Sequence, residues 1–271
     1  MPELPEVENV KRKLEPLILN QYIVGIDVYA DRIIRTPDVA QFISLVKGQT
    51  FKSVERKGKH LIFVLEKGYI VSHLRMEGKY NYTETATEKN KHDHVLFHFS
   101  NGYDLRYNDV RKFGTMDYVS HPNDVKSVDE LGPEPLDKTL TSDYLLNALS
   151  VKKSTIKHAL LDQSVVAGLG NIYVDEVLYK SGLHPEKKAN SVTKKQAILL
   201  INSIQEIITL AIEQGGSSVR SYNSLGEKGS MQTLHQVYGK NGESCSACQT
   251  LIEKTRVAGR GTHFCPTCQQ K

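Results

Sequence analysis

Two residues at the amino terminus could carry covalent catalysis. Pro2 follows the initiator Met1, and a small second residue generally permits removal of the methionine, which leaves a free secondary amine. The ordinary pKa of an α-amino group is about 8, so much of this amine is neutral and nucleophilic near physiological pH. Its attack on an aldehyde or a sugar C1′ gives an iminium ion, a good electron sink for elimination. The adjacent Glu3 could transfer protons.

The plainer alternative is that Pro2 is only a chain terminus, because retention of Met1 makes its nitrogen an amide and removes this chemistry. The elements that follow could nevertheless position it. Pro5 suits the first turn of a helix, where a missing N–H costs nothing. Glu6 lies near the positive end of that helix, which we expect over about residues 5–15.

The four cysteines form a second candidate site. They make two Cys-x-x-Cys pairs, separated by 16 residues: Cys245, Cys248, Cys265 and Cys268. This spacing matches the four-sulfur zinc template. Four thiolates leave no open position for water, so the zinc should be structural and should fold a tail too short for its own core. Two disulfides or a redox dithiol are the alternatives, and a chain without a secretory signal or a redox-fold context favours neither.

Basic residues lie between the two cysteine pairs, at Lys254, Arg256 and Arg260. Two short strands joined by a turn would project Arg260, which is flanked by Gly259 and Gly261. A guanidinium held in this way can grip phosphates with several donors. Spacing alone is equally compatible with an ordinary exposed arginine.

A glycine-containing segment, residues 165–171, interrupts two expected helices. Asn171 is a suitable N-cap for the second helix, and N–H groups at a helix start together with an asparagine amide form a phosphate site. Lys157, one helix earlier, could join them. The alternative, which the local sequence favours, is an ordinary capped helix hairpin.

Composition narrows the class of protein. The 271 residues are 39% hydrophobic with a net charge of +4, and the basic surplus lies in residues 151–271, which carry 15 basic and 9 acidic side chains. A polyanionic partner of this half is therefore indicated weakly. No apolar run approaches the roughly 20 residues of a membrane span, and the first residues do not resemble a secretory signal. We expect a cytoplasmic protein.

The elements change character along the chain. Short segments rich in β-branched and aromatic residues follow one another from about residue 21 to 119, which predicts an antiparallel sandwich or barrel. A Pro- and Gly-containing stretch over residues 120–140 is the expected linker. Helical periodicity then appears in four segments: Thr141 to Leu149, Thr155 to Gln163, Ile172 to Ser181 and Thr193 to Gln214.

Six motifs occur together in order: MPELPEVE at the start, RKGKHL at 56–61, HLRM at 73–76, YNDVRKFG at 107–114, GLGNIY at 168–173 and the four-cysteine tail. On these motifs the chain resembles bacterial formamidopyrimidine-DNA glycosylase over essentially its full length. The resemblance implies an α+β multidomain protein with an N-terminal antiparallel β-sandwich and helix, a helix–two-turn–helix bundle and a β-hairpin zinc finger. The corresponding ranges are 1–120 for the sandwich, 121–140 for the linker, 141–238 for the bundle and 239–271 for the finger.

The resemblance also implies a function and its residues. The enzyme would excise oxidised purines, chiefly 8-oxoguanine and formamidopyrimidines, from duplex DNA and cleave the abasic strand by β,δ-elimination. Pro2 would be the nucleophile that forms a Schiff base, Glu3 the general acid/base, and Lys59 the active-site lysine. Positions that hold the DNA backbone would be His73, Arg111, Lys157, Asn171, Tyr238 and Arg260. One structural Zn²⁺ would be bound by the four cysteines.

Base excision requires the base to leave the stack. The resemblance implies that Met76, Arg111 and Phe113 fill the space left behind, although Met76 and Phe113 could equally be core residues by sequence alone. A loop over the extruded base would recognise the lesion, and its residues together with Glu6 would be Ser217, Ser218, Arg220 and Tyr222. Serines stand at 217 and 218 where the family often has threonines.

Two other functions remain open from the residues. An endonuclease VIII-like glycosylase for oxidised pyrimidines shares the proline amine, the helical motif and the finger. A non-catalytic damaged-DNA-binding zinc-finger protein would need neither Pro2 nor Glu3. The expected partner in the first case is duplex DNA that contains oxidised purines or abasic sites, bound by a monomer that associates with the nucleoid through DNA and not with a membrane.

Overall fold

The computed structural model describes residues 1–218 and 229–271. The chain divides into two compact units, of which the first contains Met1–Asp129 and the second contains Glu130–Ser217 and Ser230–Lys271. Each unit is described by itself below.

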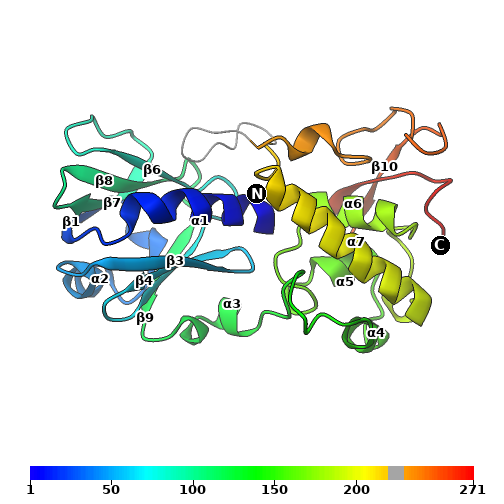
Figure 1. The fold of residues 1–271 in the computed structure, drawn as a ribbon, viewed down its shortest axis with the longest axis horizontal. Helices are drawn as coiled ribbons and strands as arrows, with labels where there is room; N and C mark the ends of the chain where they lie inside the picture. The colour runs from blue at the N-terminus through cyan, green and yellow to red at the C-terminus, as the bar shows by residue number, and fades with distance from the viewer. Residues whose placement is uncertain (219–228) are drawn as a thin grey trace. The chain divides into compact units, whose positions relative to one another are not determined.

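Two sheets and three α-helices build the first unit (Figure 1). One sheet has the strand order β1-β7-β8-β6, and the other has the order β2-β9-β5-β4-β3. The strands are β1 (Ile23–Val28), β2 (Ile34–Thr36), β3 (Phe51–Lys57), β4 (His60–Leu65), β5 (Tyr69–His73), β6 (Lys79–Glu84), β7 (Asp93–Phe99), β8 (Tyr103–Asn108) and β9 (Thr115–Val119). The helices are α1 (Leu4–Ile18), α2 (Val39–Val46) and α3 (Lys126–Asp129), with 3-10 turns η1 (Asp31–Ile33) and η2 (Pro122–Asp124).

Aromatic rings fill the sandwich core. Phe51 makes edge-to-face contacts with Phe63, Phe97 and Phe99, at centroid distances of 5.6, 6.0 and 5.9 Å. These rings belong to both sheets, because Phe51 and Phe63 lie on β3 and β4 while the other two lie on β7. The contacts supply packing beyond the burial of apolar area and fix how the two sheets face each other.

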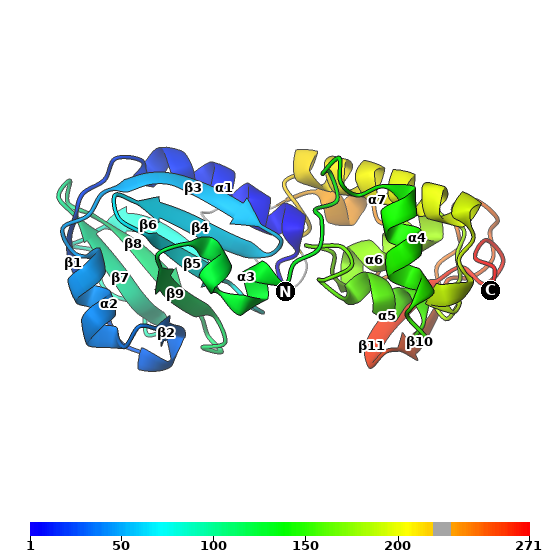
Figure 2. The same cartoon turned by 90° about the horizontal axis from the view of Figure 1, so that it is seen from below.

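The first helix, α1, lies beside β3 (Figures 1 and 2). Val7, Val10, Leu14 and Ile18 are buried, and their spacing of three and four residues places them on one face of the helix. Glu3 caps the helix, and Pro5 stands in its first turn. The helix therefore extends to Ile18, past the expected end at residue 15, because its apolar face continues to find partners in the sandwich.

Two features of the first unit were not expected. The segment Val39–Val46 forms the helix α2, which Asp38 caps by accepting a hydrogen bond from Gln41 N, whereas the sequence predicted only strands there. The pairing of β2 with β9 is parallel, while the other strand pairs are antiparallel. Parallel pairing needs a long crossover connection, which the chain between Thr36 and Thr115 supplies, and α2 within it packs on β1 and β2.

Helices dominate the second unit, as Figure 2 shows. They are α4 (Ser142–Ser150), α5 (Ile156–Leu161), α6 (Asn171–Lys180) and α7 (Lys194–Glu213), with 3-10 turns η3 (Ala189–Ser191) and η4 (Met231–Thr233). Each boundary lies within one residue of the expected one, except the end of α5, which comes two residues earlier than expected. The cap of α6 is Gly170, one residue before the expected Asn171, which occupies the first helical position instead.

Helix α7 is long and apolar enough to cross a membrane by length and composition, and within the described ranges it is the one helix that passes this test. The expectation that no run is long enough to span a membrane overlooked this helix, because Asn202 and Glu206 interrupt its apolar residues. Residues at spacings of three and four are buried, from Ala197 to Ala211, and α4 and α6 pack on the helix. This pattern is typical of a core helix in a globular unit.

The carboxyl-terminal hairpin joins β10 (Glu253–Val257) to β11 (Arg260–Phe264). Its two-residue turn places Ala258 and Gly259 at positive φ, 51° and 73°, as a tight hairpin turn with the twist of the strands requires. With the sandwich, the helical unit and this hairpin, the expected fold class is confirmed.

Candidate functional site

The amino terminus is held at the start of α1. The backbone N–H of Glu3 donates to Glu6 Oε2 at 2.7 Å, and Glu3 is only 2% exposed. Pro2 is buried, while Met1 before it is exposed. Removal of Met1 would therefore leave the Pro2 nitrogen directly before the capped start of α1, one residue before Glu3. Glu6, expected to recognise the lesion, is committed to the capping of the helix.

An ion pair ties α1 to the turn that carries Lys59. Glu8 Oε2 accepts from Arg56 Nε at 2.9 Å, and Arg56 Nη1 donates to the carbonyl of Gly58 at 3.1 Å. Gly58 has a φ of +57°, which allows a two-residue turn between Lys57 on β3 and His60 on β4. The arrangement fixes Lys59, which is 6% exposed, relative to the helix that begins beside Pro2.

Charge stabilises this connection. Burial raises the pKa of Glu8, but hydrogen bonds from Arg56 and Arg12 outweigh it, so the pKa lies below its ordinary value. The carboxylate therefore stays ionised near neutral pH and keeps both guanidinium partners.

Two histidines face each other on neighbouring strands. His60 on β4 is paired in register with His73 on β5, and their rings meet edge to face at 4.5 Å. His60 Nε2 shares a hydrogen bond with Ser127 Oγ at 3.1 Å. Burial and the nearby Arg75, Arg35 and Lys59 charges lower the pKa of His60 to about 4. Both rings are thus neutral at pH 7, because burial and the His60 ring also hold the pKa of His73 well below its usual value.

His73, expected to hold the DNA backbone, also begins a loop. Its Nδ1 accepts from the backbone N–H of Arg75 at 3.0 Å, and Arg75 has a φ of +56°. Met76, one residue later, is 38% exposed. The sequence left open whether Met76 is a core residue, and its exposure excludes that alternative.

The loop after β8 presents the other two expected void-filling residues. Phe113 is 44% exposed, and the Arg111 guanidinium lies 4.5 Å from the centre of its ring. Phe113 is therefore not a core residue either. Sequence reasoning missed Asp109, whose buried carboxylate accepts backbone hydrogen bonds from Arg111 and Phe113. An aspartate directly before a turn is the signal that could have identified it.

In the second unit, three expected DNA-contacting residues meet at one turn. Asn171 Nδ2 donates to the carbonyl of Gly261 at 2.9 Å, and Lys157 Nζ lies 3.3 Å from the same oxygen. Gly261 follows the exposed Arg260. Lys157 is fully buried and pairs with Asp175, so it holds the hairpin in place; a direct DNA contact for it stays a prediction.

A second carboxylate holds the segment before the finger. Glu176, which is buried, accepts backbone hydrogen bonds from Gln236, Val237 and Tyr238 at 2.8, 3.0 and 2.8 Å. Burial raises its pKa, while these three N–H groups act in the opposite direction. The ring of Tyr238 contacts that of His263 at 5.2 Å, which brings the expected backbone contact Tyr238 beside β11.

Ser217 lies in a buried polar cluster. Its Oγ is 2.9 Å from His235 Nε2 and 3.3 Å from the Tyr173 hydroxyl. Burial lowers the pKa of His235 to about 4, so the ring is neutral at pH 7 and can accept or donate one hydrogen bond. Two of the expected lesion-recognition residues, Arg220 and Tyr222, lie outside the described residues.

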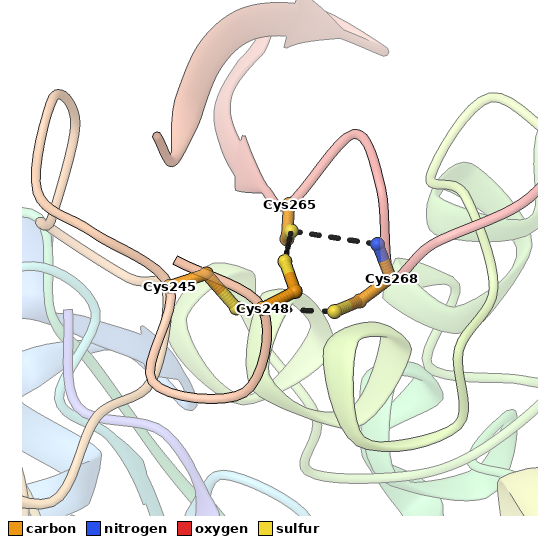
Figure 3. Close-up of side chains that lie close together, drawn as sticks. All are labelled: Cys245, Cys248, Cys265 and Cys268. Atoms are coloured by element: carbon orange, nitrogen blue, oxygen red, sulfur yellow. Dashed lines mark hydrogen bonds between the residues drawn. The ribbon is translucent and has the colours of Figure 1, made fainter. Parts of the chain in front are cut away.

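The four cysteines converge from two loops (Figure 3). Their sulfurs all lie within 4.8 Å of one another, with Cys248 Sγ and Cys265 Sγ 3.4 Å apart and Cys245 Sγ and Cys268 Sγ 3.9 Å apart. A disulfide needs about 2.05 Å. Four sulfurs on a tetrahedron with Zn–S distances of about 2.3 Å would be about 3.8 Å apart.

The cluster therefore fits one zinc ion, and the thiols are free rather than paired in disulfides. The cysteines pack with Val237, Ile252 and Tyr179, a small apolar set that could not fold the tail unaided. This confirms the expectation of a single structural zinc.

Family models match most of the chain. They are the formamidopyrimidine-DNA glycosylase N-terminal domain over residues 1–116, the formamidopyrimidine-DNA glycosylase H2TH domain over residues 131–223, and the zinc finger found in FPG and IleRS over residues 242–271. Formamidopyrimidine-DNA glycosylases of Bacillus licheniformis and Shouchella clausii are 49% and 48% identical to the chain, each over 100% of both sequences.

Similar solved structures belong to the same family as these sequence relatives. A Lactococcus lactis FPG variant in complex with Fapy-dG-containing DNA has a TM-score of 0.94 at 44% identity, with 100% of both chains covered. The Lactococcus lactis Fpg in complex with DNA that contains an abasic site has a TM-score of 0.94 at 45% identity, with 99% of this chain and 100% of that chain covered. Sequence and fold thus match together over the whole length, and the chain belongs to the formamidopyrimidine-DNA glycosylase family.

Proposed function

We propose that this DNA glycosylase of base excision repair uses the nitrogen of Pro2 to remove 8-oxoguanine and formamidopyrimidines from duplex DNA and to cleave the strand. The observation that carries the nucleophile assignment is the buried Pro2 before α1, whose first turns are fixed by the Glu3–Glu6 hydrogen bond and the Glu8–Arg56 ion pair. A nucleophile gains rate from such fixed geometry, because the reacting atoms meet without further loss of freedom.

The reaction has two stages. The Pro2 lone pair forms a bond to C1′, the bond from C1′ to the base breaks, and the base leaves with a proton. The C1′–O4′ bond then opens, O4′ takes a proton, and the amine nitrogen, which has lost its own proton, becomes an iminium ion. Loss of a C2′ proton expels the 3′ phosphate, loss of a C4′ proton expels the 5′ phosphate, and water releases the sugar fragment from Pro2.

Glu3 and Lys59 support these proton and charge movements. The Glu3 side chain neighbours Pro2 in sequence and is largely buried. As the protonated acid it can give a proton to O4′, and as the resulting carboxylate it can accept the later protons. Lys59 stands in the turn that Arg56 and Gly58 connect to α1. Its ammonium would balance the negative charge of the lesion phosphate.

The protein would bind DNA through contacts with its phosphates, made by His73, Asn171, Tyr238 and Arg260. Of these four residues, Arg260 is the most exposed. Such contacts set register without reading sequence. Met76, Arg111 and Phe113 fill the space of the extruded base, and Arg111 meets the acceptors of the unpaired cytosine. Ser217 and Ser218 border the loop that would recognise the lesion. The protein would act in the cytoplasm, on the nucleoid.

Endonuclease VIII-like activity on oxidised pyrimidines is the second candidate. Leu4 and the set of Met76, Arg111 and Phe113 favour the purine enzyme, because these residues match the motifs of the purine enzyme. Excision assays on duplexes with 8-oxoguanine·C and with thymine glycol separate the two, and faster turnover of thymine glycol would reverse the assignment.

Borohydride trapping tests the nucleophile. The demethionylated, zinc-loaded protein should become covalently joined to an 8-oxoguanine·C duplex in the presence of borohydride, since reduction makes the iminium bond permanent. Pro5→Ala, which alters a proline three residues away in the first turn of α1, is the matched control and should still be trapped. A protein with Met1 retained should not be trapped, and equal trapping of that form would refute the assignment.

A further inference from the structure

We propose that Tyr107 and Asp109 are positioning residues, which hold the loop of Met76 and the loop of Arg111 and Phe113 against one another. This role rests on the proposed function, in which Met76, Arg111 and Phe113 fill the space left by the extruded base. It concerns how the backbone orients these three side chains. Neither Tyr107 nor Asp109 is exposed, so neither would itself touch DNA.

The Asp109 carboxylate accepts hydrogen bonds from the backbone of the loop that carries Arg111 and Phe113. Its Oδ1 accepts from Arg111 N at 3.0 Å, and its Oδ2 accepts from Phe113 N and Gly114 N, each at 2.9 Å. Hydrogen bonds to an ionised acceptor are stronger than those between neutral groups. The three bonds lie on both sides of Lys112, whose φ of +54° makes the sharp bend in the loop.

The Tyr107 hydroxyl joins this loop to the other one. It lies 3.3 Å from Asp109 Oδ2, and a Cβ added at Gly114 or at Gly78 would stand only 1.6 or 2.2 Å from its oxygen. Gly78 ends the loop of Met76, which closes through the bond from Gly78 N to the carbonyl of Leu74 at 3.0 Å. The hydroxyl end of the Tyr107 ring therefore lies between the two loops. Because a side chain at Gly78 or Gly114 would collide with it, both positions require glycine.

A further bond anchors Asp109 from the sheet. The backbone carbonyl of Asp109 is 3.0 Å from Nε2 of the buried His94, which lies on β7. The loop is thus fixed at its first residue by a strand and at its last residues by a carboxylate. Ordinary core packing would account for the burial of Tyr107, but it does not account for three loop N–H groups directed at one carboxylate.

The consequence is a rigid backbone beneath exposed side chains. Met76 and Phe113 are 38% and 44% exposed, and the Arg111 guanidinium already rests on the Phe113 ring. Side chains that must enter DNA gain affinity when they are held in place beforehand, because less freedom is lost on binding. Loss of the anchors should therefore weaken the insertion of these side chains without touching the chemistry at Pro2.

Three substitutions separate the anchors. Tyr107→Phe removes only the hydroxyl, and Asp109→Asn keeps the shape of the side chain but cannot accept from all three N–H groups. Asp104→Asn is the matched control, since Asp104 is equally buried on the same strand and bonds to Thr85, His98 and Arg106, away from both loops. It reports on loss of a buried carboxylate alone.

The readouts are affinity for a duplex with a tetrahydrofuran abasic analogue opposite cytosine, and trapping on a single-stranded oligonucleotide with an abasic site. Only the duplex leaves an unpaired base and a space to fill. Asp109→Asn and Tyr107→Phe should weaken duplex affinity by about tenfold or more, the worth of a lost charge-assisted bond, and leave single-strand trapping within about twofold of the parent. Asp104→Asn should keep the parental ratio of the two.

The chain has no tryptophan, so Phe113→Trp supplies a single reporter at the loop. Its emission should be quenched on binding the duplex and should be quenched less when Asp109→Asn is added. Equal quenching and unchanged duplex affinity in the Asp109 and Tyr107 variants would overturn the inference, as would equal losses on duplex and single strand.

Phe113→Ala distinguishes this inference from the function on which it rests. If Phe113→Ala weakens duplex binding while both anchor variants do not, the anchors have no positioning role and the void filling stands. If Phe113→Ala leaves duplex binding unchanged, void filling by Phe113 fails and the positioning role fails with it. The glycosylase assignment survives either result as long as borohydride trapping succeeds.

Discussion

Lys157 Nζ lies 2.6 Å from Asp175 Oδ1, and neither side chain is exposed. The same lysine also donates to Thr262 Oγ1 at 2.8 Å, and the second oxygen of Asp175 accepts from His263 N at 2.9 Å. The pair therefore joins α5 and α6 to β11, and it fixes the strand that begins with Arg260.

Breaking this pair should be costly. Asp175→Asn leaves the Lys157 ammonium buried without its carboxylate, a change that usually costs about 3–5 kcal/mol in the free energy of unfolding. Urea unfolding of the zinc-loaded protein measures it. The double variant Lys157→Met, Asp175→Leu removes both charges and should recover most of the loss. A single variant as stable as the parent would show that the pair does not hold the hairpin.

Zinc removal should cost DNA affinity more than it costs the sandwich. Cys248→Ser takes one sulfur from the cluster, so the hairpin of Arg260 loses the ion that folds it. Affinity for an abasic-analogue duplex should fall, while near-ultraviolet circular dichroism of the tyrosine- and phenylalanine-rich sandwich stays largely unchanged. Ser246→Ala, next to the cysteines, is the control. Parental affinity after verified loss of zinc would contradict this expectation.

Pro2→Gly should bind damaged DNA as the parent does but excise poorly. The primary amine of glycine differs from proline in basicity and in position, whereas the DNA contacts lie elsewhere. Binding to an abasic-analogue duplex and single-turnover excision of 8-oxoguanine separate the two effects. Intact-mass measurement first establishes that Met1 is absent from both proteins. Undiminished turnover would exclude Pro2 as the nucleophile.

Binding should weaken as salt rises, in proportion to the number of phosphates that are contacted. Arg260→Ala should reduce the slope of log affinity against log salt by about 1, the value for one phosphate contact on duplex DNA. Arg32→Ala, an exposed arginine of the first unit outside the expected DNA contacts, should leave the slope unchanged. A parental slope in the Arg260 variant would remove it from the phosphate contacts.

The His60 ring should make stability fall with acid. Its folded-state pKa of about 4 lies below the ordinary value of 6.5, so the unfolded chain binds more protons between these values. Stability from this group is complete above pH 6.5 and is lost as pH falls toward 4, which amounts to about 2 kcal/mol between pH 7 and pH 5. His60→Gln should flatten that part of the curve in urea unfolding. Identical pH dependence in both proteins would count against a buried neutral ring.

Local patterns in the sequence were sufficient for much of the fold. Apolar periodicity indicated α5 and α7, and the structure shows that Thr155 and Thr193 cap them. The cysteine spacing indicated the zinc site, since both the ligands and their ion are local to one short tail. The helix α2 was missed because its apolar residues also suit strands, and only their burial against β1 and β2 selects the helix.

Residues of the candidate site that belong to a sequence motif could be predicted. Their interaction partners could not be predicted where those partners are distant in sequence. Nothing near Glu8 in sequence indicates Arg56 as its partner. Likewise, nothing near Lys157 indicates Asp175, 18 residues away, or Thr262, 105 residues away. Exposure also decided what sequence left open, since Met76 and Phe113 suit a core as well as a surface by type alone.

The sequence by itself thus determined the family, the candidate nucleophile Pro2, the metal ligands and the order of the elements. These features depend on local spacing and residue chemistry. Only the tertiary structure decided which charged side chains are buried together and which backbone N–H groups donate hydrogen bonds to a carboxylate such as that of Asp109. Those pairings depend on strand register and helix packing, which bring together side chains that no local pattern connects.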